Sequence, residues 1–102
     1  MIQIHAPLFS IGKLVATPAA LAAIDEEGTS PFEFVARHAR GDWGSDLTDE
    51  DRILNDESVK SGSRILSAYV LQKSNERLWC ITEAADDHGQ RSATTLLLSS
   101  EY

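Results

Sequence analysis

The chain has 102 residues, of which 42% are hydrophobic and 25% charged, a composition typical of one soluble globular domain that excludes wholesale disorder. Its formal net charge is −7 at pH 7, which excludes a nonspecific nucleic-acid binder, because such proteins need a basic surface. An acidic surface suits either simple solvation or a basic partner.

The first predicted elements are a strand and a helix. Residues 11–16 (Ile-Gly-Lys-Leu-Val-Ala) have the composition of a short strand. Thr17 and Pro18 are typical of an N-cap followed by proline at the first helical position. We therefore expect a helix over residues 19–27, with Gly28 as its C-terminal stop.

A second helix is predicted directly after the first. Ser30 and Pro31 repeat the start signal. Apolar residues then recur at i, i+3, i+4 and i+7, which predicts one inward-facing helical surface made of Phe32, Val35, Ala36 and Ala39. The pattern ends at residues 41–44 (Gly-Asp-Trp-Gly), where two glycines favour a tight turn and the tryptophan is expected to pack onto a core.

The third predicted helix begins in an acidic segment. Thr48 is a suitable N-cap, and residues 49–51 (Asp-Glu-Asp) place negative charge at the positive end of the helix dipole. Gly62 is the expected end of this helix. Its buried side is predicted to consist of Ile53, Leu54 and Val59.

Three strands are predicted in the last third of the chain, over residues 64–71, 78–83 and 92–98. Residues 73–76 are expected to form a hairpin loop between the first two strands, and residues 85–90 connect the second strand to the third. The element order is therefore β-α-α-α-β-β-β.

This order predicts a single α+β domain over residues 1–102, with three helices packed on a small, mainly antiparallel sheet of three to four strands. Replacement of a core tryptophan is expected to be costly in such a small domain. The predicted core consists of Leu21, Ile24, Phe32, Val35, Trp43, Ile53, Leu54, Leu66, Trp79, Ile81 and Leu97.

The compartment predicted from the sequence is the cytoplasm. Cys80 is the single cysteine, so no intramolecular disulfide is possible. Residues 1–5 lack the basic segment and long apolar core of a signal peptide, and no apolar run approaches the length of a membrane span.

Several short motifs resemble a known family. They are Gly41-Asp42-Trp43-Gly44, the runs over residues 64–69, 79–84 and 91–98, and the final Glu101-Tyr102. Together they resemble small proteins carried on bacterial plasmids, phages and integrated elements, labelled plasmid-related or hypothetical and sometimes as a type I restriction-modification subunit. Here residues 85–90 lengthen a connection that is direct in the family. The resemblance implies a mobile-element setting and no established catalytic residues.

Two interpretations of the polar residues stay open, and the first is a small nucleic-acid- or nucleotide-processing enzyme. His38 and Asp42 are four residues apart, a spacing that can place an acid–base pair on one helical face, and Glu83 is a further candidate. A single His–Asp pair is not a metal signature, so we expect no metal and no cofactor. Cys80 lies between apolar strand residues and is expected to be a buried, inert thiol. Glu83 and Arg91 are expected to form a polar pair across the last hairpin.

The second interpretation is a non-catalytic module that binds a protein. Residues 42–57 carry seven carboxylates against one arginine, an arrangement that suits either a solvated helix or the basic groove of a nucleic-acid-handling protein. An anti-defence inhibitor, such as an anti-CRISPR or anti-restriction protein, would use such a surface. We expect a host or competing-element protein as partner, with no direct nucleic-acid binding and no membrane contact. The predicted partner-binding residues are Asp42, Trp43, Asp46, Asp49, Glu50, Asp51, Asp56 and Glu57.

Overall fold

A computed structural model describes residues 6–102 and confirms the predicted α+β fold. The expectation about a signal peptide over residues 1–5 lies outside the described residues. The observed elements are β1 (Lys13–Ala16), α1 (Pro18–Glu27), α2 (Pro31–Ala39), α3 (Asp49–Ser61), β2 (Ile65–Val70), β3 (Arg77–Thr82), β4 (Ala93–Leu98) and a final 3-10 turn, η1 (Ser99–Glu101).

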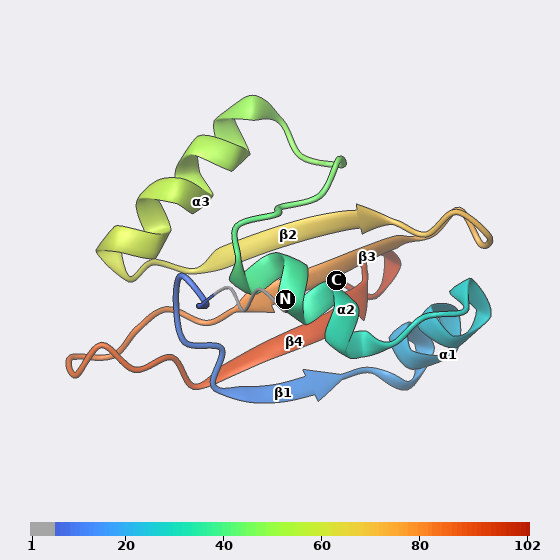
Figure 1. Cartoon of the computed structure of the whole chain (residues 1–102), viewed down its shortest axis with the longest axis horizontal. Coiled ribbons are helices and arrows are strands. Elements are labelled where there is room, and N and C mark those ends of the chain that lie inside the picture. The colour runs from blue at the N-terminus through green and yellow to red at the C-terminus, as the bar shows by residue number, and fades with distance from the viewer. Residues whose placement is uncertain (1–5) are drawn as a thin grey trace, which may run out of the picture.

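The four strands form one sheet in the order β1-β4-β3-β2 (Figure 1). The pairs β2–β3 and β3–β4 are antiparallel, as predicted, and β1 pairs in parallel with β4. Helices α1 and α2 pack on one face of this sheet, whereas α3 lies along the β2 edge (Figure 1). The sheet therefore has one face covered by two helices and one face that α1 and α2 leave uncovered.

The helix ends follow the predicted local signals. The side-chain oxygens of Thr17, Ser30 and Thr48 each accept a hydrogen bond from a backbone N–H in the first turn of the helix that follows. Gly28 and Gly62 end α1 and α3 in the left-handed conformation, with φ values of 80° and 86°. These ends are confirmed because each signal acts within a few residues of chain.

The main core lies between the sheet and the pair α1 and α2. Of the predicted core residues, Ile24, Val35, Trp43 and Ile81 are buried. The strand residues of this core lie on the sheet face opposite to that of the predicted ones. Together with residues of α1 and α2, the core consists of Ala20, Ala23, Ile24, Phe34, Val35, Tyr69, Leu71, Leu78, Cys80, Leu96 and Leu98.

The predicted inward faces of the helices were wrong at five positions, one of which is Ala36, exposed on α2. Phe32 is 72% exposed, because α2 turns Phe34, Val35 and His38 toward the sheet instead. Leu21 is exposed because the small residues of α1, such as Ala20 and Ala23, pack closely on the sheet. Two further exposed side chains, Ile53 and Leu54, belong to α3.

Three predicted strand positions are only half-buried, namely Leu66, Trp79 and Leu97. Consecutive strand residues point to opposite faces, and the register places these three on the face that α1 and α2 do not cover. The neighbours Leu96 and Leu98 are the residues of β4 that enter the core.

A second cluster of buried residues joins α3 to the sheet and contains Phe9, Trp43 and Ile65. The turn before α3 reaches this cluster through Gly44, which has φ +86°. A β-carbon at Gly44 would overlap the backbone of Ala68 in β2, so only glycine allows so close an approach. The expected role of glycine at this turn is confirmed.

Candidate functional site

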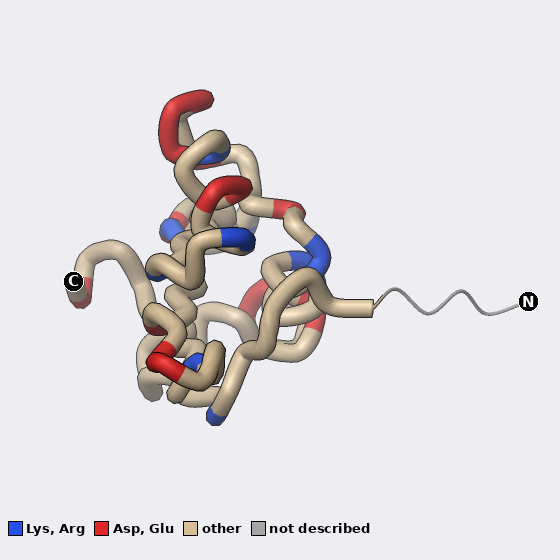
Figure 2. The backbone as a smooth tube through the Cα atoms, turned by 90° about the vertical axis from the view of Figure 1, so that its left-hand side faces the viewer, with Lys and Arg blue, Asp and Glu red and all other residues tan. Residues whose placement is uncertain are grey.

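The predicted acidic site is built from α3 and the loop before it. Five of its carboxylates lie on α3 and are exposed: Asp49, Glu50, Asp51, Asp56 and Glu57. Figure 2 shows these acidic segments gathered at the top of the molecule, where α3 lies in Figure 1. The remaining predicted residues, Asp42, Trp43 and Asp46, lie in the preceding loop and are at least partly buried.

The inner side of α3 is held by polar contacts. The guanidinium of Arg52 donates to the carbonyl oxygen of Gly44 at 2.5 Å. Asn55 Nδ2 donates to the carbonyl oxygen of Leu66 at 2.7 Å, and Asn55 Oδ1 accepts from the Leu66 N–H at 3.1 Å. Arg91 Nη2 donates to the carbonyl oxygen of Ser58 at 3.0 Å, in the last turns of the helix. Asn55 and Ser58 are the buried residues of α3. Of the three apolar residues predicted for this side, only Val59 packs inward, against the cluster of Phe9, Trp43 and Ile65.

The outer side of α3 combines charge with apolar surface. Glu50, Ile53, Leu54 and Glu57 recur at i, i+3, i+4 and i+7, which places them along one stripe of the helix. Ile53 and Leu54 are each 57% exposed. We name these four residues the α3 stripe. Ile53 and Leu54 therefore form a small exposed apolar patch between two carboxylates.

Asp42 and Asp46 make ion pairs within the chain. Asp42 Oδ2 lies 2.7 Å from Arg37 Nε, and its Oδ1 accepts from the Gly44 N–H at 3.2 Å. The hydrogen bond from Arg37 holds the pKa of Asp42 below its ordinary value. Asp46 Oδ2 lies 3.2 Å from Arg77 Nε. These two carboxylates therefore hold the loop rather than project from it.

Trp43 is a core residue. It is 5% exposed, and its ring stacks at 6.2 Å from Phe9 and edge-on at 5.9 Å from His38. Its indole Nε1 donates to Asp56 Oδ1 at 3.0 Å. The prediction of Trp43 as a direct partner contact was therefore wrong, because its side chain is enclosed, and Asp56 has a structural role as its acceptor.

His38 lies fully buried in a chain of hydroxyl groups. Thr94 Oγ1 donates to the carbonyl oxygen of Ile11, so it accepts from Thr82, and Thr82 in turn accepts from His38 Nε2 at 2.8 Å. His38 Nδ1 therefore accepts from Ser67 Oγ, 2.5 Å away. The imidazole is neutral with its proton on Nε2, and burial lowers its pKa from 6.5 to about 4.

The three residues of the enzyme interpretation bind different partners. His38 bonds to Ser67 and Thr82, whereas Asp42 bonds to Arg37. Glu83 is exposed at the end of β3, and Arg91 donates to its backbone carbonyl oxygen at 3.0 Å, not to its carboxylate. The expected side-chain pair between Glu83 and Arg91 was therefore wrong, because the Arg91 guanidinium bonds to backbone carbonyl oxygens instead.

The remaining chemically reactive side chain is Cys80. It is fully buried in the main core, as predicted for an inert thiol. Burial raises its pKa, because the surrounding apolar groups cannot solvate a thiolate. Cys80 therefore contributes to packing.

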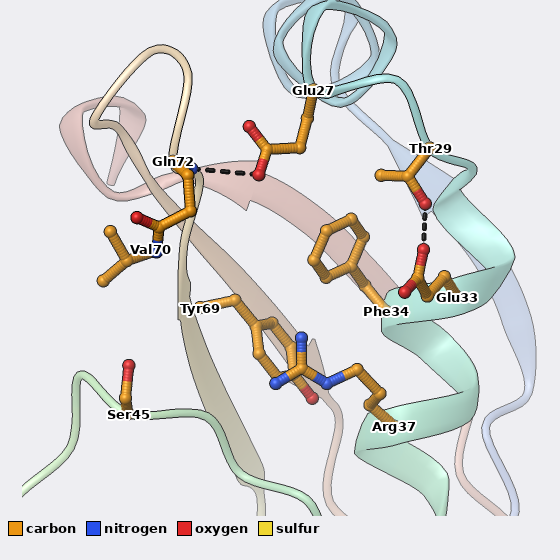
Figure 3. Close-up of a pocket in the computed structure, with 9 residues that line it drawn as sticks. All are labelled: Glu27, Thr29, Glu33, Phe34, Arg37, Ser45, Tyr69, Val70 and Gln72. Atoms are coloured by element: carbon orange, nitrogen blue, oxygen red, sulfur yellow. Dashed lines mark hydrogen bonds between the residues drawn. The ribbon is translucent and has the colours of Figure 1, made fainter.

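A hollow of about 400 Å³ lies between α2 and the end of β2 (Figure 3). Its floor is the ring of Tyr69, with the guanidinium of Arg37 4.5 Å above the ring centroid. Glu27 accepts from the backbone N–H groups of residues 72 and 73, each at 2.9 Å, and Glu33 accepts from Thr29. Because Arg37 is paired with Asp42, the charged groups around this hollow are satisfied within the chain.

The candidate site residues that the sequence did not indicate are Ile53 and Leu54, which were assigned to the core. A usable signal was present, because α3 has too few apolar residues to form a continuous inward stripe. Asn55 and Arg52 also follow helical spacing on the opposite side, where they can reach backbone groups.

Comparisons with known proteins return nothing for this chain. No family model matches it, and neither the curated proteins nor the solved structures contain a match. Within residues 6–102, no helix has the length and apolar character needed to cross a membrane.

Proposed function

We propose that this chain is a non-catalytic, acidic binding module of a mobile genetic element, and that it docks the α3 stripe on a basic surface of a partner protein. The observation that carries the proposal is the outward placement of Ile53 and Leu54 between Glu50 and Glu57. The inner side of α3 is already anchored by Asn55, so the stripe is left free to meet a partner.

The stripe has the composition of a helix that binds in a groove. Such helices insert apolar anchors at i, i+3, i+4 and i+7 spacing, and charged residues around the anchors set orientation. Ile53 and Leu54 would supply the apolar contact, while Glu50 and Glu57 would face basic side chains of the groove. The net charge of −7 would accelerate the encounter with a basic partner.

The partner class that fits is a nucleic-acid-handling protein. Its substrate groove is basic, because it neutralises phosphates, and an acidic helix can occupy that groove in place of nucleic acid. The resemblance to proteins of plasmids and phages favours a host or competing defence complex in the cytoplasm, such as a CRISPR or restriction effector. Binding would then inhibit the effector by competition, and no chemistry of the chain's own would be needed.

The test is inhibition of purified CRISPR and type I restriction effectors, measured as loss of DNA cleavage while the chain is added. The paired variant Glu50→Lys/Glu57→Lys should weaken inhibition at least about tenfold, because it reverses charge on the stripe. Asp56 is left unchanged, since it accepts from Trp43. A matched control, Asp25→Lys/Glu26→Lys on α1, changes the net charge equally at exposed positions and should keep full inhibition.

A second pair of variants separates the apolar contact from the charge. Ile53→Ala/Leu54→Ala keeps every carboxylate and removes exposed side chains only, so the fold should persist while inhibition weakens. If the stripe variants inhibit as well as the α1 control, α3 is a solvated helix and the proposal is wrong. If no effector is inhibited by the wild-type chain, the assigned partner class is wrong.

A further inference from the structure

Arg91 is a buried positive charge without a carboxylate partner. It is 6% exposed, and its guanidinium lies 5.5 Å from the centroid of the Phe9 ring. The ion pairs among residues 6–102 involve two other arginines, and none involves Arg91. Burial lowers the pKa of Arg91, and within the described chain no carboxylate opposes this shift. Buried arginines are normally paired with an anion, and Arg91 departs from this rule.

Three backbone carbonyls hold the guanidinium and leave part of it free. Nη1 donates to the carbonyl oxygens of Ser63 and Glu83 at 2.8 and 3.0 Å, and Nη2 donates to that of Ser58 at 3.0 Å. Arginine has five N–H donors, so the Nε–H and one Nη2–H have no acceptor among the described residues. Nε and Nη2 share one edge of the guanidinium, and such an edge binds a carboxylate or a phosphate through two hydrogen bonds.

A hollow of about 420 Å³ gives access to this edge of Arg91. Every fully buried side-chain nitrogen or oxygen of residues 6–102 has a hydrogen-bond partner, so the unbonded Nε is not fully buried and opens on the hollow that Arg91 lines. The walls are the segment before β1, the last turn of α3 and the connection between β3 and β4. Figure 1 shows these three segments together at one end of the sheet. A ligand in the hollow can therefore reach the free edge of Arg91.

The hollow combines positive charge with some apolar surface. Lys60, in the last turn of α3, lines it together with Arg91. Lys60 is exposed and forms no ion pair within residues 6–102. Phe9 and Val59 add apolar surface to the same walls. Two cations beside an apolar surface suit a molecule that carries a doubly charged anion on a small organic group.

Two carboxylates of the connection between β3 and β4 also line the hollow, those of Asp86 and Asp87. Asp86 Oδ1 accepts from the N–H groups of His88 and Gln90, each at 2.9 Å, so this carboxylate is held by its own connection. Asp87 is exposed to solvent. In the described chain neither forms an ion pair with the arginine or the lysine of the hollow, so both cations stay available to a ligand.

We propose that this hollow binds the phosphate group of a small phosphomonoester. The phosphate accepts from the Nε–H and the free Nη2–H of Arg91, and the ammonium of Lys60 meets its second negative charge. It supplies the counter-charge that the buried guanidinium lacks. A phosphate fills only part of about 420 Å³, so the organic part of the molecule lies beside Phe9 and Val59.

The experiment is an NMR titration of the isotope-labelled full chain with inorganic phosphate, glycerol phosphate and adenosine monophosphate, with ionic strength held constant by sodium chloride. The side-chain Nε–H signal of Arg91 should shift on binding, because it gains a charged acceptor. The backbone N–H signals of Gly62 and Gly89, which line the hollow, should shift with it. At least one of the two monoesters should bind about fivefold or more tightly than inorganic phosphate, because its organic part adds contacts.

Two lysine variants test the charge of the hollow. Lys60→Gln should weaken binding of the monoester about fivefold or more, because it removes one of the two cations. Lys73→Gln is the matched control: Lys73 is exposed in the loop between β2 and β3, outside the hollow, and this variant should bind as the wild type does. Arg91→Lys should abolish binding, since lysine has no such edge. If Arg91→Lys fails to fold, the Nε–H signal and the lysine variants carry the test.

An Arg91 Nε–H signal that stays in place at about 20 mM of each probe overturns the proposal. So does equal binding by Lys60→Gln and Lys73→Gln, and so do the same shifts with sodium chloride alone. Equal affinity for all three probes would keep phosphate as the ligand and overturn the assignment of an ester. Ile53→Ala/Leu54→Ala should bind the monoester normally, and Lys60→Gln should still inhibit an effector, which separates this site from the α3 stripe.

Discussion

The side-chain amide of Asn55 pairs with both backbone groups of Leu66, so a helix residue takes the place of a neighbouring strand at the β2 edge. Ala68 is the next residue of β2 whose backbone groups point away from β3. Its N–H donates to the carbonyl oxygen of Trp43, in the loop before α3, at 3.0 Å. The β2 edge is thereby closed to pairing with another strand, and α3 is fixed in position.

Asn55→Ala should destabilise the domain by about 2–3 kcal/mol, because it removes two hydrogen bonds and leaves buried backbone groups of Leu66 unpaired. Urea unfolding measures this change. Glu57→Ala, at an exposed position of the same helix, should stay within about 0.5 kcal/mol of the wild type. Equal effects of the two substitutions would show that the Asn55 contacts do not fix α3.

The buried His38 should make stability depend on pH. Its pKa is about 4 in the folded chain against an ordinary 6.5, so below pH 6.5 the unfolded state takes up a proton that the folded state does not. Stability should therefore fall by up to about 3 kcal/mol as the pH drops from about 6.5 to about 4. Above pH 6.5 both states are neutral, and this contribution is constant.

The measurement is urea unfolding at successive pH values, with His38→Gln as the control. Glutamine keeps a donor toward Thr82 and does not titrate, so the slope between pH 6.5 and about 4 should flatten. Loss of stability from protonation of Asp42, whose pKa is lowered by Arg37, stays in both proteins. An unchanged slope in His38→Gln would contradict the assignment.

Trp43→Ala should destabilise the domain by about 3–5 kcal/mol, because it empties a site enclosed by Phe9 and His38 and leaves Asp56 without its donor. Trp79→Ala should destabilise the domain less, because Trp79 is only half-buried, on the sheet face that α1 and α2 leave uncovered. Thermal unfolding of the two variants side by side checks the order. A Trp43→Ala protein with a near-wild-type melting temperature would mean that this side chain is not part of the core.

Helix ends were predictable from sequence because their signals are local. Thr17 and Thr48 cap α1 and α3 through donors three residues away. The parallel pairing of β1 with β4 joins residues such as Leu14 and Thr94, which are distant in the chain, and no local pattern encodes it. The element order was thus predictable, and the position of β1 in the sheet was not.

Which side chains face the core was less predictable, because both choices looked apolar. In β4 three leucines follow one another, and a shift of one residue exchanges Leu97 for Leu96 and Leu98. In α2, Phe32 and Phe34 lie on different faces. Phe34 faces the sheet together with His38, which bonds to Ser67 and Thr82, two residues that are distant from it in the chain.

The acidic character of the candidate site was predictable from residues 42–57. Which of its carboxylates are exposed was not predictable. Only the structure separates the exposed carboxylates of α3 from Asp42 and Asp46, which make ion pairs with Arg37 and Arg77. The exposure of Ile53 and Leu54 follows from Asn55 binding the backbone of β2, a contact that spacing alone does not reveal.

The most direct test of the α3 stripe is the association rate constant with an inhibited effector, measured at increasing salt for the wild type and for Glu50→Lys/Glu57→Lys. Electrostatic steering predicts a wild-type rate that falls steeply between about 50 mM and about 500 mM salt, and a lower rate with a shallower slope in the variant. Identical rates and slopes for the two proteins would contradict binding through α3.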